Sequence, residues 1–129
     1  MKLCTLRENH LFAKAYGKGK RCATSSVVVY TLRDLHAGLL KKQHPKKIMQ
    51  NRVGLTVTKK LGGAVERNRI KRRLRAAYAE ICKQHTVKVG FLIVLVARSA
   101  TLDVSFDTLV ADLLRGMKKT GLILDGEQN

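Results

Sequence analysis

The sequence predicts an α/β fold of the α+β type, a two-layer sandwich in which helices pack on a central sheet. Segments with helical periodicity alternate along the chain with short segments rich in β-branched residues. The 129 residues match the usual size of one domain, and 45% of them are hydrophobic, which is enough for a single core. Because no internal repeat or low-complexity segment interrupts this pattern, we expect one domain over residues 1–129.

The N-terminal half predicts one short helix followed by two strands. Over residues 8–16, four apolar side chains form a helical stripe that is ended by Gly17 and Gly19; the stripe consists of Leu11, Phe12, Ala15 and Tyr16. The stretch VVVYTL at 27–32 is dense in β-branched and aromatic residues, which favours a strand. In RVGLTVT at 52–58, apolar and other residues alternate, so this strand has one apolar face. Residues 33–51 hold the only proline and four lysines, which predicts a long solvated loop with at most a helical turn at AGLLKK.

The C-terminal half predicts a helix, a buried strand and a second helix. From 63 or 64 to 82, apolar residues recur on one side of a helix, namely Ile70, Leu74, Ala77, Tyr78 and Ile81. FLIVLVA at 91–97 is continuously apolar, as expected for a central strand covered on both faces, although periodicity alone does not exclude a buried helix. Strand, helix and strand together indicate a crossover connection. A last helix is expected to follow the N-cap Ser105 and to end at Gly121. Six of its side chains point inward, namely Phe106, Leu109, Val110, Leu113, Leu114 and Met117. We expect residues 121–129 to form a loose tail.

Charge and cysteine content limit the partners and the compartment. The formal net charge of +17, from 26 basic and 9 acidic residues, exceeds what solubility requires and predicts a polyanionic partner. Cys4, Cys22 and Cys82 are odd in number and contain no Cys-x-x-Cys pair, which favours free thiols in a reducing compartment. The N-terminus lacks the apolar segment of a signal peptide, and the longest apolar run is too short to cross a bilayer. We therefore expect a cytoplasmic protein without a membrane partner.

The strongest local signal is a run of six cations, within ERNRIKRRLR, on the helix predicted at 63–82. If Ile70 faces the core, all six lie around the remaining surface of the helix: Arg67, Arg69, Lys71, Arg72, Arg73 and Arg75. Three pairs spaced four residues apart carry like charges, each costing about 0.2–0.5 kcal/mol in an isolated helix. A phosphate backbone relieves such repulsion through counterion release, and guanidinium groups grip phosphates or stack on bases. Structured RNA is therefore the expected ligand of this helix, and the alternative is a basic face that only contacts solvent. Asn68, between two arginines, is either an amide that contacts a base or an ordinary surface residue.

These residues carry a resemblance to a known family. TKKLGGAVERNRIKRRLRAAY, at 58–78, closely resembles the signature of the bacterial ribonuclease P protein subunit, and HLFAKAYGKGKR, VVVYTL and RVGLTVTKK agree with that family too. In that family an RNA subunit removes the 5′ leader of precursor tRNA with magnesium ions, while the protein binds this RNA and holds the leader in a cleft. The resemblance therefore implies two partners, ribonuclease P RNA and precursor tRNA. It also implies Mg²⁺ bound mainly by RNA, and no catalytic residue or metal ligand in the protein.

The resemblance also implies site residues. Positions that match the family's basic helix, together with the basic pair before it and Arg73 in the same charge run, are expected to bind the catalytic RNA and the substrate: Lys59, Lys60, Arg67, Asn68, Arg69, Lys71, Arg72 and Arg75. Positions that match the leader cleft are Phe12, Lys14, Tyr16, Val28 and Tyr30. On spacing alone Phe12 and Tyr16 fit a core stripe, whereas unpaired nucleotides stack on aromatic faces, and the resemblance favours stacking.

The fold that the resemblance implies is more detailed than the one that periodicity predicts. It has a short N-terminal helix, a mostly four-stranded central sheet, the basic second helix in a strand-helix-strand crossover, and a C-terminal amphipathic helix. The family's crossover is left-handed, against the right-handed rule for such connections. Nothing in the sequence itself indicates this handedness.

Three other function classes fit parts of the pattern. An enzyme acting alone has little support, because the sequence has no phosphate-binding loop, no nucleophile elbow and no HExxH motif, and Cys82 with His85 supplies only half of a structural zinc site. A structural RNA-binding protein of the ribosomal type shares the charge, the size and the α/β pattern. Only the aromatic residues beside an apolar strand favour a single-strand cleft over that alternative. A DNA-binding module is the weakest alternative, since no helix-turn-helix or finger spacing is present.

Overall fold

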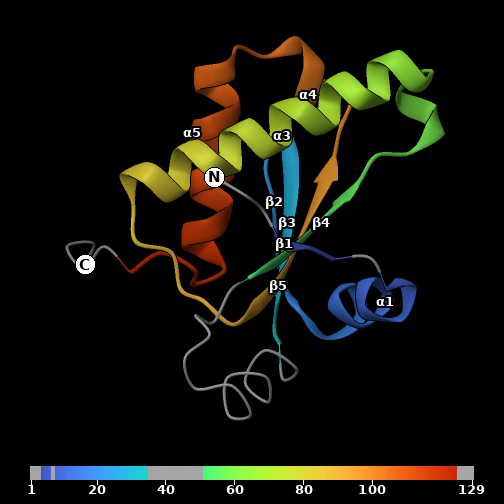
Figure 1. Cartoon of the computed structure of the whole chain (residues 1–129). Helices are drawn as coiled ribbons and strands as arrows, with labels where there is room; N and C mark the ends of the chain where they lie inside the picture. Colours follow the sequence, from blue (N-terminus) through green and yellow to red (C-terminus); the bar gives the residue numbers. More distant parts are fainter. Residues whose placement is uncertain (1–3, 7, 35–50, 125–129) are drawn as a thin grey trace.

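One mixed sheet organises the chain (Figure 1). A computed structural model describes residues 4–6, 8–34 and 51–124, so the predicted loop at 33–51 lies, apart from its ends, outside the described residues. The strand order is β1-β4-β5-β3-β2, and β1 has only two residues, so four strands make up most of the sheet. The elements are β1 (Cys4–Thr5), α1 (Asn9–Lys18), β2 (Lys20–Ala23), β3 (Val27–Arg33), β4 (Arg52–Thr56), the 3₁₀ turn η1 (Lys59–Leu61), α3 (Ala64–Gln84), β5 (Phe91–Ala97), α4 (Ala100–Asp103) and α5 (Phe106–Lys119).

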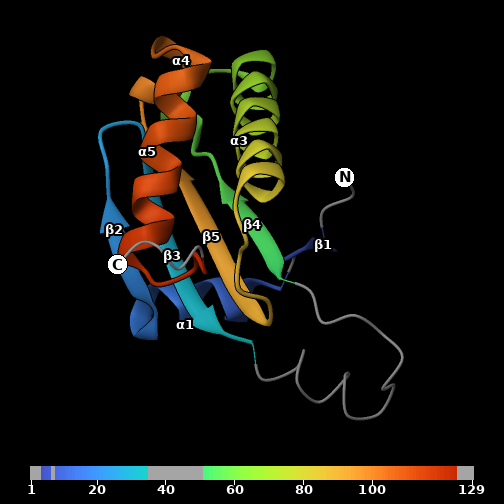
Figure 2. The ribbon, with the colours of Figure 1, turned by 90° about the vertical axis from the view of Figure 1, so that its left-hand side faces the viewer.

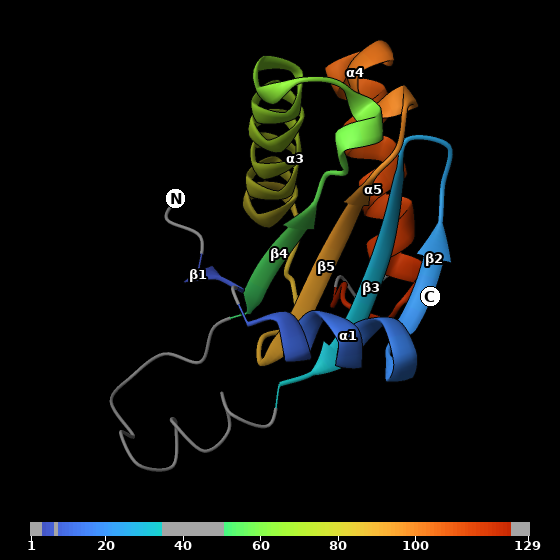
Figure 3. The same cartoon turned by 90° about the vertical axis from the view of Figure 1, so that its right-hand side faces the viewer.

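The helices cover the two faces of the sheet unequally. Figures 1 and 3 show α3 and α5 side by side on one face, while α1 is the helix that crosses the other face in the part of the chain that the structure describes. The larger core lies under α3 and α5, and a smaller core lies under α1. The predicted α-β sandwich with a short N-terminal helix is therefore confirmed. Because α1 covers only part of its face, side chains of the sheet stay accessible beside it.

Strand β5 lies at the centre of the sheet, as its apolar run predicted. It pairs in parallel with β4 and antiparallel with β3. Ile93 and Leu95 point into the larger core, whereas Leu92 and Val94 point into the smaller one, and none of the four is more than 2% exposed. Burial on both faces explains why this strand lacks the alternation of polar and apolar residues that marks a half-buried strand.

The crossover from β4 through α3 to β5 places the basic helix. The apolar stripe that the periodicity predicted is the buried side of α3, namely Ile70, Leu74, Ala77, Tyr78 and Ile81. With the strands pointing upward and α3 in front of the sheet, the chain moves from β4 to β5 toward the left in Figure 2. The crossover is therefore left-handed, as the resemblance implied, against the right-handed rule. Asn51 helps to hold it, because its side-chain amide donates to the Lys88 carbonyl at 2.7 Å and its side-chain oxygen accepts from the Phe91 N–H at 2.9 Å.

Helix α5 follows the predicted pattern, with one polar exception in its buried side. Ser105 caps the helix by accepting a hydrogen bond from the Thr108 N–H at 3.1 Å. Asp112 is only 5% exposed and accepts a hydrogen bond from the Ser26 hydroxyl at 2.7 Å. It also forms a salt bridge with Arg115. A buried carboxylate needs such partners, and this one fastens α5 to the turn between β2 and β3.

Two features differ from the predictions. Lys20–Ala23 forms strand β2. These four residues do not have strong β-propensity, so the sequence did not indicate a strand here. Pairing with β3 stabilises it. The expectation of a loose tail over 121–129 is wrong for residues 121–124. Leu122 is fully buried in the larger core, its carbonyl accepts from the Lys88 N–H at 2.7 Å, and Ile123 bridges to Val87. Residues 125–129 lie outside the described part of the chain.

We predict that Leu122→Ala destabilises the fold by about 2–4 kcal/mol, because it opens a cavity in the core beneath α5. Leu124→Ala is the matched control: Leu124 is 51% exposed, so its truncation should change the free energy of unfolding by less than about 0.5 kcal/mol. Urea unfolding of both variants measures the difference. Equal, small changes in the two midpoints would mean that the segment after α5 is loose after all.

Candidate nucleic-acid interface

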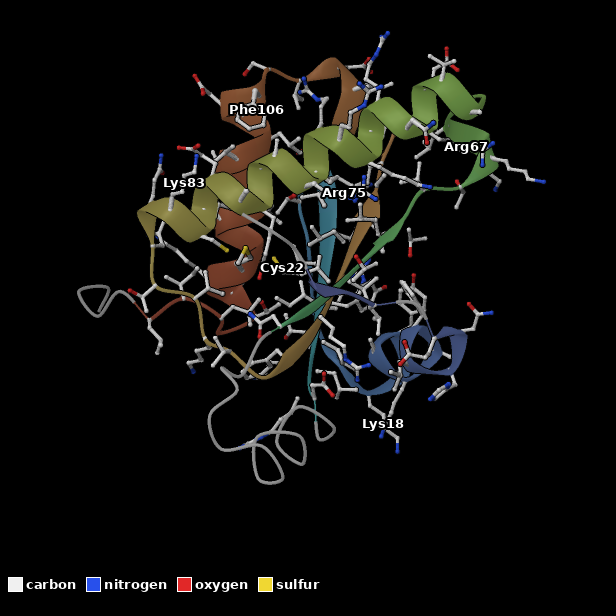
Figure 4. The ribbon with its side chains drawn as sticks, viewed as in Figure 1. Lys18, Cys22, Arg67, Arg75, Lys83 and Phe106 are labelled. Atoms are coloured by element: carbon white, nitrogen blue, oxygen red, sulfur yellow. The ribbon has the colours of Figure 1, made fainter. Side chains whose placement is uncertain are left out.

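The cations of α3 gather on the sides of the helix that do not face the core. Asn68, Arg69, Arg72 and Arg75 are exposed, and Lys71 is half-buried. Figure 4 shows Arg67 beside the N-terminal end of the helix and Arg75 on the side that faces β4. In the part of the chain that the structure describes, no cation of this helix forms a salt bridge with a carboxylate. Within the described residues, the one-sided charge that the sequence showed is therefore not neutralised by ion pairs.

Arg73 differs from the other cations of the run. Its guanidinium donates to the backbone carbonyls of Thr101, at 3.1 Å, and Val104, at the two ends of the α4 segment. These bonds tie α3 to the α4 segment and hold the guanidinium against its backbone. The structure thus gives Arg73 a structural role in joining two helices, which the charge run alone could not reveal.

A short turn leads into the basic helix and adds two more cations. Lys59 and Lys60 are exposed on η1, directly before the N-terminus of α3. Gly62 connects the two elements with φ of 134°, a conformation that L side chains rarely adopt. The Glu66 carboxylate accepts from the Gly63 N–H at 3.0 Å and so caps the helix. Glu66 is the acidic residue in the first turn of α3, and the cations of the helix outnumber it, so their charge is largely uncompensated along the helix.

On the other face of the sheet, three aromatic side chains form a row, which we call the aromatic row and define as Phe12, Tyr16 and Tyr30. The ring centroids of Phe12 and Tyr16 are 6.5 Å apart, and those of Tyr16 and Tyr30 are 4.9 Å apart with an edge-to-face angle of 75°. Tyr16 is 41% exposed, although its spacing fitted a core stripe. Val28 lies on the same sheet face as Tyr30, two residues before it on β3.

Contacts with β4 fix the position of the aromatic row. The Phe12 ring packs onto Gly54, where a Cβ would lie 2.4 Å from the Phe12 Cζ atom, so only glycine leaves room for this ring. The Tyr16 hydroxyl forms a hydrogen bond with the Thr56 hydroxyl. Lys14, which the resemblance grouped with the row, lies elsewhere on α1. It lines a cavity of about 280 Å³ together with Leu32, Arg33 and Leu92.

A cavity of about 190 Å³ joins the aromatic row to the basic helix. It is lined by Phe12 from α1, by Val53 and Leu55 from β4, and by Lys71 and Arg75 from α3, together with Thr5 and Leu6. Two groups of residues that are far apart in the sequence thus share one hollow at the edge of the sheet. An aromatic ring beside two cations suits a nucleotide, which presents both a flat base and a phosphate.

An ion-pair network anchors α1 at the start of β4. The Arg52 guanidinium donates to the Asp34 carboxylate through two nitrogens, at 2.7 and 2.9 Å, and to Glu8 at 2.9 Å. The hydrogen bond from Arg52 to Asp34 raises the pKa of the guanidinium further above its ordinary value, despite partial burial. Arg52 thus stays charged and holds together the residue before α1, the end of β3 and the start of β4. Neither spacing nor the resemblance pointed to these three residues.

Comparison with known proteins identifies the family. The family model for ribonuclease P matches residues 1–121 of the chain. The "Ribonuclease P protein component" of Alkaliphilus oremlandii is 35% identical over 118 residues, which cover 92% of this chain and 91% of that protein. The corresponding protein of Bacillus cereus is 32% identical over 117 residues, covering 91% and 90%. The chain belongs to the bacterial ribonuclease P protein family.

Solved structures of the family share this fold. The ribonuclease P protein of Staphylococcus aureus superposes with a TM-score of 0.72 at 28% identity, covering 95% of this chain and 100% of that one. The family member from Thermotoga maritima gives a TM-score of 0.69 at 24% identity, covering 89% and 96%, and supports the fold alone. As a family member, the chain is a component of the ribonuclease P holoenzyme, which cleaves the leader from precursor tRNA.

Arg21 lies beside the aromatic row, and neither the charge run nor the resemblance singled it out. It lies on β2 directly opposite Tyr30, and its Nε donates to the Tyr30 hydroxyl at 3.2 Å. A cation one strand away from an aromatic residue is a usable sequence signal only when the strand pairing is known.

Among the described residues, no helix is long and apolar enough to cross a bilayer.

Proposed function

We propose that this ribonuclease P protein binds the RNA subunit through the exposed side of α3 and the 5′ leader of precursor tRNA along the aromatic row. The observation that carries the proposal is the cavity where Phe12 meets Lys71 and Arg75. A substrate that crosses from one surface to the other passes from cations that hold structured RNA to aromatic rings that hold a single strand. The two RNAs would therefore meet at this cavity.

The charge of α3 supports its role in binding RNA. Arg69, Arg72 and Arg75 are exposed and have no carboxylate partner among the described residues, so their like charges repel one another. Binding to a phosphate backbone releases counterions and removes this repulsion. The guanidinium fork also matches phosphate oxygens bidentately, which a lysine ammonium cannot do. A face made only for solubility gains nothing from such a one-sided arrangement.

The accessible sheet face supports binding of an unpaired leader. Sequence-tolerant proteins that bind single strands stack bases on aromatic rings, with cations nearby for the backbone. Tyr16 offers such a ring at 41% exposure, and Tyr30 lies beside it. Double-helical RNA does not present bases for stacking, so the aromatic row favours a single-stranded ligand over the helical RNA that a purely structural binder holds.

The proposal assigns the hydrolytic chemistry to the RNA subunit, with magnesium held mainly by RNA. The described residues contain no group of three or more histidine, cysteine, aspartate or glutamate side chains placed to hold a metal ion. The contribution of this chain is to bind and orient the two RNAs. The cytoplasm, where precursor tRNA is made in bacteria, is the compartment that this role requires.

The experiment that tests the function is precursor-tRNA cleavage at moderate magnesium, using a bacterial ribonuclease P RNA alone, this protein alone, and the two together. We expect efficient cleavage at the mature 5′ end only from the combination. Cleavage by the protein alone would move the chemistry to the protein. A combination no more active than the RNA alone would leave only a structural role in RNA binding.

We predict that Arg72→Ala weakens binding to ribonuclease P RNA and reduces the slope of log affinity against log salt by about one unit, because one phosphate contact is lost. Lys83→Ala is the control: it removes the same charge from the last turn of the same helix (Figure 4) and should leave the slope unchanged. Filter binding over a salt series measures both. A slope for Arg72→Ala that equals the wild-type slope would exclude the exposed side of α3 around Arg72 as the RNA surface.

We predict that Tyr16→Ala lowers kcat/KM for precursor tRNA by the equivalent of about 1–3 kcal/mol, the loss expected for one stacked base. The inhibition constant of mature tRNA, which has no leader, should not change. Tyr16→Phe is the matched control, since it keeps the ring, loses only the bond to Thr56 and should behave nearly as wild type. If Tyr16→Ala weakens both tRNAs equally, the ring supports the fold and does not bind the leader.

A further inference from the structure

The aromatic row continues onto the edge strand of the sheet through Arg21. On β2, Arg21 pairs directly with Tyr30 of β3, and cross-strand partners in an antiparallel pair project from the same face. Its Cζ atom lies 5.9 Å from the centroid of the Tyr30 ring. Across the sheet, the order of side chains is therefore Phe12 over β4, Tyr16 beside it, Tyr30 on β3 and Arg21 on β2.

The bond to Tyr30 holds the Arg21 guanidinium in a defined orientation. The Nε–H donates to the Tyr30 hydroxyl at 3.2 Å, which uses one of the five N–H groups of the side chain. The structure shows no other side-chain hydrogen bond and no salt bridge of Arg21 with a described residue, and the residue is exposed. Both terminal nitrogens are thus available as a fork, the geometry that fits two oxygens of a phosphate.

Comparison with other arginines supports a ligand for this one. Arg52 and Arg115 neutralise carboxylates, and Arg73 and Arg98 donate to backbone carbonyls. Contacts within the fold therefore account for the hydrogen bonding of those four guanidinium groups. Arg21 is oriented by a neutral phenol and keeps its full charge at the open end of the aromatic row. This is the arrangement expected where the anion comes from outside the protein.

The two ends of the row are not equivalent. Phe12 shares a cavity with Lys71 and Arg75 of α3, whereas Arg21 lies on the edge strand at the opposite side of the sheet. We propose that Arg21 binds a phosphodiester of the leader beyond the nucleotides that stack on the aromatic row, and so sets the length of leader that the protein can use. This inference rests on the proposed leader-binding function and adds a residue to that site.

The proposal makes the effect of Arg21 depend on leader length. A short leader ends before it reaches the edge strand, so it cannot gain from this cation. A long leader crosses the whole row and gains a charge-assisted contact to phosphate. The benefit of lengthening the leader should therefore disappear when the guanidinium is removed.

The test measures kcat/KM of the reconstituted holoenzyme for one precursor tRNA that carries either about two or about ten leader nucleotides. Arg21→Ala should lower kcat/KM about tenfold for the long leader and leave the short leader unchanged, as expected for one charge-assisted contact. For the long leader, the log-log salt slope of binding should fall by about 0.7, the value for one phosphate of a single strand.

Lys20→Ala is the matched control. Lys20 precedes Arg21 on β2 and projects from the opposite sheet face, where its Nζ lies 3.8 Å from the position that a Cβ on Gly121 would take. The variant removes the same charge from the same strand, so it should not alter the dependence on leader length. A loss in Lys20→Ala equal to that in Arg21→Ala would overturn the proposal, because the effect would then reflect net charge alone.

The remaining outcomes separate this inference from the function on which it rests. If Tyr16→Ala impairs the precursor while Arg21→Ala does not affect the long leader, the leader lies on the row but Arg21 does not bind it. If Tyr16→Ala has no effect either, the leader-binding function itself is wrong. An equal loss for short and long leaders in Arg21→Ala would mean that the side chain only supports Tyr30.

Discussion

The burial of β5 on both faces is the constraint on which the rest of the structure depends. Each face of a strand that carries only apolar residues must be covered, because every exposed square ångström of apolar surface costs about 25 cal/mol. One face of β5 needs the layer of α3 and α5, and the other needs α1. Ile93 and Leu95 on one side, and Leu92 and Val94 on the other, thus determine where three helices must lie.

Packing of α3 onto this core lets the helix carry charges that would destabilise it in isolation. Its like-charged pairs cost a few tenths of a kcal/mol each, whereas burying one leucine or isoleucine side chain contributes about 1.5–3 kcal/mol. Ile70, Leu74 and Ile81 are at most 1% exposed, so the buried stripe outweighs the repulsion on the outer side. The helix can therefore present a one-sided charge pattern, and the fold does not depend on neutralising it.

Helix α1 serves both the core and the accessible surface. Ala15 is fully buried against the sheet, while Tyr16, the next residue, is 41% exposed beside Tyr30. The Phe12 ring contributes to both the packing and the surface, since it packs on Gly54 and also lines the cavity next to Arg75. Among the described residues, α1 is the helix on this face, and Tyr16 stays partly exposed beside it.

The sequence by itself determined the main elements, the burial of α3 and β5, and the concentration of cations on one helix, because periodicity and charge are local properties of neighbouring residues. The resemblance supplied the aromatic positions and the left-handed crossover. Only the tertiary structure decided that Arg73 bonds to α4, that Leu122 completes the core, and that Arg21 lies beside Tyr30. These contacts join segments that are far apart in the sequence. Which segments become neighbours is determined by strand pairing and helix packing, and therefore only once the whole sheet has formed.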